Sequence, residues 1–120
     1  MIVGIPTDTA EGLDAPRCGH FGHAPFFTLA TIEDGTATKL EVYQNIDHGQ
    51  YGCGGVIEYA ISLGMDAMIA VGMGLPPLTR FTNAGIKVYS DQVHPTVREV
   101  LIAFLNDELQ LMDPANACRH

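Results

Sequence analysis

The sequence predicts an α/β fold built around one mixed β-sheet. Its first third contains β-branched and aromatic segments, two of which are joined by Asp34-Gly35, a pair typical of tight hairpin turns. Its later part alternates short apolar segments with segments in which apolar residues recur every three or four positions. With 120 residues, 47% of them hydrophobic, the chain has the size and composition of one domain with one core.

Three strands are predicted before the first helix. Residues 1–6 are strongly apolar, and residues 26–33 and 36–45 are rich in β-branched and aromatic side chains. Between the first two strands, residues 7–24 are rich in Gly, Pro, Asp and Thr and predict a long loop. Loops of this length are usually functional or mobile.

The rest of the chain is predicted to alternate helices and strands after a second glycine-rich loop at 46–55. These elements are a helix over 56–63 closed by Gly64, a strand over 66–71, a helix over 76–84, a strand over 86–90 and a helix over 97–105. The last helix has the clearest start signal, because Thr96 and Glu99 form a capping box. A short segment, 108–112, precedes the end of the chain.

The order of these elements fixes a topology. The hairpin makes the first three strands antiparallel neighbours, and the helical crossovers make the later strands parallel to their predecessors. We therefore expect a mixed five-stranded sheet in the order 3-2-1-4-5 with flanking helices, a topology that resembles the ribonuclease H-like motif. The loops 7–24, 46–55, 72–76 and 90–95 would then all lie at one sheet edge, where open α/β sheets bind ligands.

Charge and hydropathy exclude two classes of partner. The formal net charge is −8 with only six Lys and Arg, which argues against binding nucleic acid. No apolar run reaches the roughly 18 residues of a membrane span. The segment "MIVGIP" lacks the basic region of a secretory signal, so we expect a cytoplasmic protein.

Soft metal donors are concentrated in the predicted loops. The candidate metal ligands are Cys18, His20, His23, His48 and Cys53. Thiol and imidazole groups suit Zn, Fe, Cu or a metal–sulfur cluster better than Mg or Ca. The spacing matches no zinc finger and lacks the four cysteines of an ordinary iron–sulfur site, whereas a cluster that brings its own sulfides needs fewer protein ligands.

Glycines next to predicted helix starts favour an anionic ligand, because bare backbone N–H groups at a helix start attract negative charge. The candidate cluster-binding residues are Arg17, Gly19, Gly22, Gly52, Gly54, Gly55, Gly72, Met73 and Gly74. Arg80 is a second basic residue placed to help. Structural interpretations remain beside these: a turn for Cys18, His20 and His23, packing for Cys53 and Met73, and a solvated loop residue for His48. His94 precedes Pro95 and is interpreted as a neighbour of a helix N-cap.

The segment "CGHFGHAPFF" resembles the S-x-H-F-G-x-A-P-x-F signature of the nitrogenase iron–molybdenum cofactor biosynthesis family. "AVGMGLPPLTRFTNAGIKVY" and "TVREVLIAFLNDEL" resemble its following motifs, so the match covers roughly residues 1–110. His20 matches the family histidine, whereas Cys18 stands where many members have serine and His23 where arginine or lysine is common. The resemblance implies a ribonuclease H-like fold and a small cluster-binding domain over 1–111, with a C-terminal tail over 112–120.

We therefore expect a non-enzymatic protein that binds, stores or delivers an anionic metal–sulfur cluster of Mo with Fe or Cu. A cluster donor or recipient protein is the expected partner. Two alternatives stay open: a mononuclear Zn or Cu sensor or metalloenzyme, and a partner-binding module without a cluster. The sequence leaves the oligomeric state open, and also whether Cys118 and His120 join the site.

Overall fold

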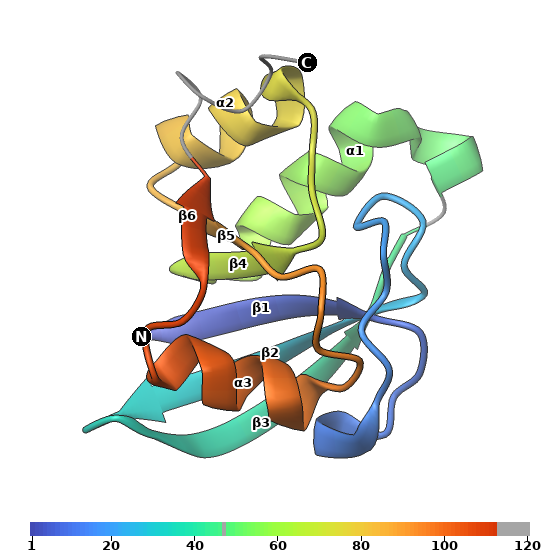
Figure 1. Ribbon diagram of the computed structural model, residues 1–120. Coiled ribbons are helices and arrows are strands. Elements are labelled where there is room, and N and C mark those ends of the chain that lie inside the picture. Colours follow the sequence, from blue (N-terminus) through green and yellow to red (C-terminus); the bar gives the residue numbers. More distant parts are fainter. Residues whose placement is uncertain (47, 113–120) are drawn as a thin grey trace.

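The structure is a computed structural model that describes residues 1–46 and 48–112, with only the backbone described at 48–53. The strands are β1 (Ile2–Thr7), β2 (Phe26–Glu33), β3 (Thr36–Gln44), β4 (Ala67–Ala70), β5 (Lys87–Ser90) and β6 (Gln110–Met112). The helices are α1 (His48–Ser62), α2 (Leu75–Asn83) and α3 (Val97–Leu105), with a single 3-10 turn, η1 (Gly12–Asp14). All strands belong to one open sheet in the order β3-β2-β1-β4-β5-β6 (Figure 1), which confirms the predicted mixed α/β architecture and the order of the five predicted strands.

The sheet has one strand more than predicted. Strand β6 pairs antiparallel with β5, with Val88 opposite Met112 and Ser90 opposite Gln110. A three-residue segment is too short to show the alternation that identifies a strand in a sequence. Its pairing with β5 therefore became visible only in the folded chain.

The β2–β3 hairpin forms at the predicted turn. Asp34 and Gly35 have φ angles of 52° and 74°, the left-handed values that a two-residue type I′ turn requires at both positions. The turn sets the antiparallel register of β2 and β3, and it makes β3 run in the same direction as β1.

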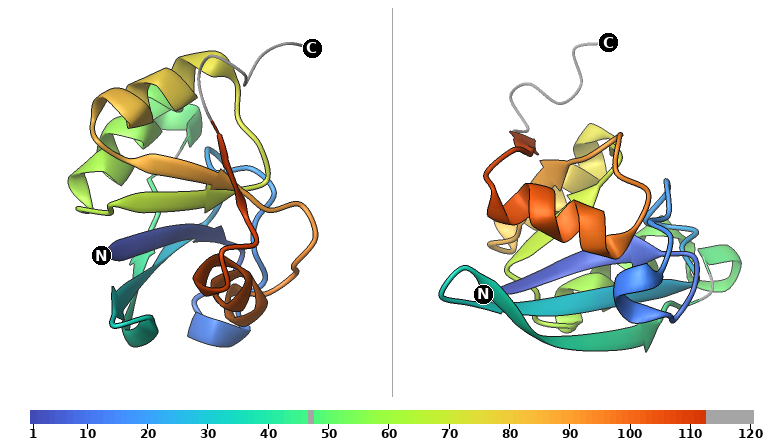
Figure 2. Two further views of the ribbon diagram at one scale, coloured as in Figure 1. Left: turned by 60° about the vertical axis from the view of Figure 1, so that its left-hand side comes forward. Right: turned by 60° about the horizontal axis from the view of Figure 1, so that its bottom comes forward.

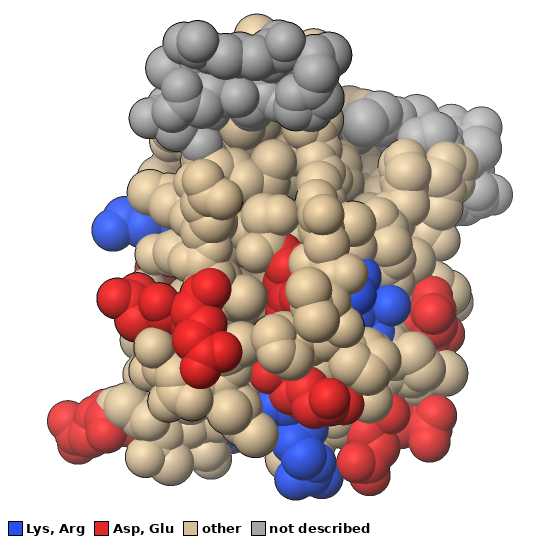
Figure 3. All heavy atoms as spheres, in the orientation of Figure 1, with Lys and Arg blue, Asp and Glu red and all other residues tan. Residues whose placement is uncertain are grey.

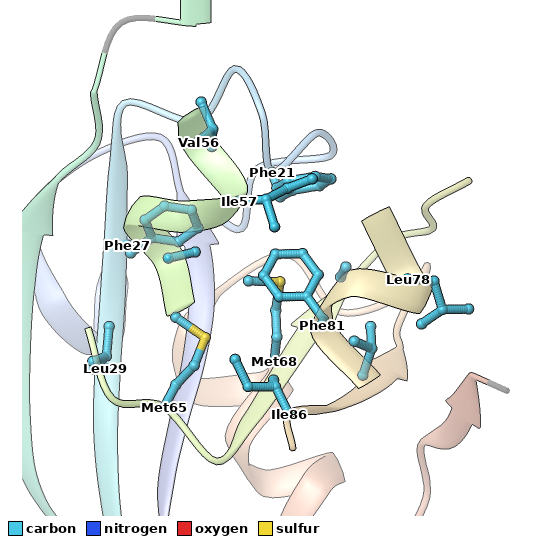
Figure 4. Packing of buried hydrophobic residues seen from close by; sticks show 13 residues of the cluster. Phe21, Phe27, Leu29, Val56, Ile57, Met65, Met68, Leu78, Phe81 and Ile86 are labelled. Carbon is cyan, nitrogen blue, oxygen red and sulfur yellow. The ribbon is translucent and has the colours of Figure 1, made fainter. Parts of the chain in front are cut away.

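Helices cover both faces of the sheet. Figure 2 shows α1 and α2 on one face and α3 with η1 on the other. The α1 and α2 side is filled by Phe27, Met68, Leu78 and Phe81, among others (Figure 4), and the α3 side by a second cluster. Strands β1 and β4 are buried on both faces, which explains their continuous apolar character in the sequence.

Helix α1 begins earlier than predicted. The sequence predicted a loop over 46–55 and a helix from Val56, whereas the backbone is helical from His48. Gly52, Gly54 and Gly55 each disfavour a helix by about 1 kcal/mol relative to Ala. Val56 and Ala60, both fully buried, pack the helix onto the sheet, and such packing supplies most of the stability of a helix in a protein.

Helix α3 begins at the predicted capping box. Thr96 is the N-cap, its Oγ1 accepts a hydrogen bond from the Glu99 backbone N–H at 3.4 Å, and the Thr96 hydroxyl donates to Glu99 Oε1 at 2.9 Å. The N-cap also ties the helix to the rest of the chain, because Pro16 forms an isolated bridge with Thr96.

Replacing Thr96 with alanine is expected to lower the free energy of unfolding by about 1 kcal/mol, because the substitution leaves a helix N–H group without its acceptor. Urea denaturation measures the change. Thr82→Ala, at an exposed position in α2, is the matched control and should change stability by less than about 0.5 kcal/mol. Equal changes in the two variants would contradict a capping role.

In the described part of the chain, no helix has both the length and the apolar character needed to cross a membrane.

Candidate functional site

The predicted edge of the sheet is where the candidate residues lie. Strand β1 is antiparallel to β2, which is antiparallel to β3, and β1, β4 and β5 are parallel. The chain therefore leaves β1, β3, β4 and β5 at the same edge, the right-hand side of the sheet in Figure 1. The loop at 8–25, the start of α1, the turn at 71–74 and the loop at 91–96 surround this edge.

Backbone contacts hold the second half of the loop at 8–25, where the chain returns to the sheet. Arg17 forms a bridge with Thr7, and its backbone N–H donates to the Pro95 carbonyl at 2.8 Å. The Cys18 backbone N–H donates to the Pro6 carbonyl at 2.8 Å. Cys18 is thereby held beside the end of β1, at the centre of the sheet.

Cys18 is a half-buried free thiol. Its Sγ lies 3.5 Å from the His20 carbonyl oxygen. Burial raises the pKa of the Cys18 thiol, and the Asp8 carboxylate adds to the increase, against the opposing effects of a backbone hydrogen bond with His20 and of the Arg17 charge. The thiol is therefore protonated at neutral pH, and a metal that binds it must displace the proton.

A tight turn places two histidines side by side. The His23 N–H donates to the His20 carbonyl at 3.1 Å, and the two imidazole centroids are 4.6 Å apart. Phe21, between them in sequence, is only 5% exposed and packs edge-to-face on Phe81 of α2 (Figure 4). The buried phenyl ring anchors the turn, while His20 and His23 are exposed.

Asn45 ties this turn to the end of β3. Its Nδ2 donates to the carbonyl of Phe21 at 3.3 Å and to that of Ala24 at 2.8 Å. The turn therefore lies against the segment that leads into α1. The turn and the end of β3, although more than 20 residues apart in sequence, are therefore in direct contact.

Because α1 begins earlier than predicted, five predicted site residues lie in a helix and not in a loop. His48 is the first residue of the helix, and Gly52, Cys53, Gly54 and Gly55 are inside it rather than in a loop before it. From the fifth helical residue onward, backbone N–H groups bond to carbonyls one turn earlier. The N–H groups of these glycines are therefore committed to the helix, and the side chains of His48 and Cys53 lie outside the described residues.

Gly72 and Gly74 lie in the predicted loop between a strand and a helix. Gly72, Met73 and Gly74 connect β4 to α2, and Gly74 is the N-cap of α2 with no side-chain cap. Among the described residues, a Cβ atom added to Gly72 would meet nothing within 4 Å, as at Gly19, so these residues leave both backbones accessible to a ligand. Met73 is half-buried and packs against the core, which agrees with its structural interpretation.

Two arginines, Arg17 and Arg80, lie near this edge of the sheet and could bind an anion. On the face shown in Figure 3, acidic side chains gather in the lower half of the view. Arg80 is paired with Glu58 at 2.6 Å and lies against α1 at Gly54. Arg17, by contrast, makes no ion pair with the described residues, and its Nε donates to the His94 carbonyl at 2.8 Å. Its positive charge therefore has no carboxylate partner in the part of the chain that the structure describes.

A histidine–aspartate pair at the same edge was missed in the sequence analysis. His94 Nδ1 lies 2.8 Å from Asp91 Oδ2, while Asp91 Oδ1 accepts the backbone N–H groups of Val93 and His94. Burial alone would raise the pKa of Asp91, but these two N–H groups and the His94 ring outweigh it and lower the pKa below its ordinary value. The spacing Asp-x-x-His just after a predicted strand was the available signal.

The described side chains of the site do not form a chelate for a single ion. Within residues 1–46 and 54–112, no three His, Cys, Asp or Glu side chains are grouped closely enough to hold a metal ion. The loop instead brings together one thiol, two adjacent imidazoles and an arginine that has no carboxylate partner among the described residues. This arrangement suits a larger anionic ligand that contacts several separate groups.

Among known protein families, the one described as dinitrogenase iron-molybdenum cofactor matches residues 1–107. The chain belongs to this family. The match confirms the resemblance read from the motif around His20 and associates the chain with small proteins of iron–molybdenum cofactor type. No curated protein matches the sequence.

Solved structures confirm the fold of this family member. The crystal structure of PH0822 has a TM-score of 0.78 at 24% identity, with 93% of this chain and 96% of that chain covered. The apo form of the orange protein from Desulfovibrio gigas has a TM-score of 0.74 at 21% identity, with 92% of each chain covered. MJ0327 from Methanocaldococcus jannaschii has a TM-score of 0.73 at 18% identity, with 94% and 95% covered.

Proposed function

We propose that this member of the dinitrogenase iron-molybdenum cofactor family binds an anionic metal–sulfur cluster and carries it between proteins, without catalysing a reaction. The cluster is cargo and contains Mo with Fe or Cu. The observation that carries the proposal is the loop in which Cys18 Sγ lies 3.5 Å from the His20 carbonyl oxygen and the rings of His20 and His23 are adjacent, at the edge of the sheet where β1 ends. Thiol and imidazole donors are those that such metals prefer.

The charges at the edge support an anionic cargo. Arg17 has no carboxylate partner among the described residues, and the exposed backbones at Gly19 and Gly72 leave room for sulfide ligands to approach. A reducing compartment such as the cytoplasm keeps Cys18 available as a thiol. Among the described residues, no three ligating side chains are grouped as a mononuclear Zn or Cu site would require.

A metal and sulfide inventory tests the proposal. The protein is purified without oxygen, incubated with tetrathiomolybdate and either Cu(I) or Fe(II), and freed of unbound metal by gel filtration. We expect visible absorption that co-elutes with the protein and a sulfide-to-metal ratio that requires a cluster. Failure to retain metal and sulfide would refute carriage, and one metal without sulfide would indicate a mononuclear site.

Replacing His20 with alanine is expected to weaken cluster retention at least tenfold, equivalent to about 1.4 kcal/mol, because it removes one donor while Phe21 keeps the turn in place. Titration followed by the visible absorption measures the affinity. Ile102→Ala, at an exposed position on α3, is the control. If both variants bind as the wild type does, His20 is not a ligand.

A further inference from the structure

The imidazole of His94 is held in one orientation by a buried carboxylate. Asp91 follows β5, and its side chain is 1% exposed, whereas that of His94 is 31% exposed. An ionised carboxylate only accepts hydrogen bonds, so the proton of a neutral His94 ring is on Nδ1, which faces Asp91 Oδ2. The other nitrogen, Nε2, then has a free lone pair and makes no hydrogen bond within the described residues.

Hydrogen bonds also hold the backbone around the His94 ring in place. Asp91 Oδ1 accepts two backbone N–H groups at 2.8 and 3.0 Å, and the Asp91 N–H donates to the Ala70 carbonyl at 2.9 Å. Arg17 Nε donates to the His94 carbonyl, and the Arg17 N–H donates to the Pro95 carbonyl. The loop of His94 is therefore joined directly to the segment that carries Cys18.

We propose that His94 is a further metal ligand for the cargo, which it binds through Nε2 while Asp91 holds Nδ1. This inference rests on the proposed function. A carboxylate that binds the second nitrogen of a histidine fixes the tautomer and raises its basicity as a ligand, an arrangement found around most metal-bound histidines. A rigid ring also loses little side-chain entropy when it binds.

The position of His94 identifies the part of the cargo it contacts. Asp91 and His94 belong to the loop after β5, whereas Cys18, His20 and His23 belong to the loop after β1, two strands away in the sheet. His94 would thus bind a metal at the side of the cluster that faces β5. Contacts from both loops would hold the cluster without a compact chelating group, and none is found among the described residues.

Nitrogen NMR of the histidine rings tests the ligand role directly. The ¹⁵N-labelled protein is titrated with tetrathiomolybdate and Cu(I), both of which are diamagnetic. We expect the Nε2 resonance of His94 to shift on loading while Nδ1 remains protonated. A resonance that does not move at saturation, or a ring protonated on both nitrogens in the loaded protein, would overturn the proposal.

Two substitutions separate ligation from loop structure. Asp91→Asn keeps an oxygen for the two backbone N–H groups but turns an amide N–H toward Nδ1, which moves the ring proton onto Nε2 and blocks ligation. We expect a loss of affinity of roughly tenfold. His94→Gln keeps a hydrogen-bond donor for Asp91 without an imidazole, and we expect a loss at least as large. Val93→Ala, next to His94 and 80% exposed, should bind as the wild type does.

The outcomes for the two proposals can be told apart. Wild-type protein that takes up no metal and sulfide overturns the proposed function itself. A different set of results overturns only the role of His94. In that case the wild-type protein loads normally, Asp91→Asn and His94→Gln bind with normal affinity, and the Nε2 resonance of His94 does not shift on loading. Circular dichroism of each variant shows whether a loss of binding accompanies a loss of fold.

Discussion

Phe81→Ala is expected to lower the free energy of unfolding by about 3–5 kcal/mol, the largest stability effect in the molecule that we predict. Phe81 is fully buried between the sheet and the turn that carries His20 and His23. Its ring contacts that of Phe21 at a centroid distance of 5.6 Å. The substitution removes the apolar contacts of a whole ring and leaves a cavity. A domain of this size has a total stability of roughly 5–15 kcal/mol.

Thermal and urea denaturation of the metal-free protein measure this change, with an expected decrease in Tm of roughly 10–20 °C. Ile102→Ala, which also truncates an apolar side chain but at a position 54% exposed, should change stability by less than about 0.5 kcal/mol. Because Phe21 loses the ring on which it packs, we also expect the His20–His23 turn to become mobile. A Phe81 variant of wild-type stability would contradict the packing shown in Figure 4.

Asp91→Ala is expected to lower the free energy of unfolding by about 2–4 kcal/mol. The change removes the acceptor of three hydrogen bonds, two from backbone N–H groups and one from the His94 ring, at a position that is 3% exposed. Asp91→Asn is the matched control, because its amide oxygen still accepts from both backbone groups. We expect it to retain most of the stability.

The contribution of Asp91 should depend on pH in one direction. Its folded-state pKa is lowered, so the ionised form stabilises the fold fully above the ordinary carboxyl pKa of about 4 and less as the pH falls through the folded value. The stability difference between wild type and Asp91→Ala should stay constant from about pH 5 to pH 7 and decrease below about pH 4. Urea denaturation at several pH values measures it, and a difference that is unchanged at low pH would refute an ionised Asp91.

Local signals were sufficient for most of the architecture. The left-handed turn at Asp34-Gly35, the Thr96–Glu99 capping box and the apolar stripe of the last helix each act within a few residues. With these elements in place, the handedness and direction rules for crossovers fix the order of the five predicted strands. The same rules bring the loops after β1, β4 and β5 to one edge, as the structure confirms.

The start of α1 could not be predicted from local preference. Glycine disfavours helices in isolation, so the segment around Gly52, Gly54 and Gly55 was interpreted as a loop. Packing of Val56 and Ala60 on the sheet compensates for this preference. Strand β6 is a similar case, since three residues form a strand only because β5 offers an edge to pair with.

The amino-acid sequence by itself determined the family, the fold class and the cluster of donors in the loop at 17–23, because turns, caps and short motifs depend on neighbouring residues. The tertiary structure decided which distant groups meet. Only folding places Asp91 beneath His94 and joins both to Arg17, and only folding shows that the glycines of α1 are inside a helix. These contacts depend on burial and on the meeting of separate loops at one sheet edge, neither of which a single segment contains.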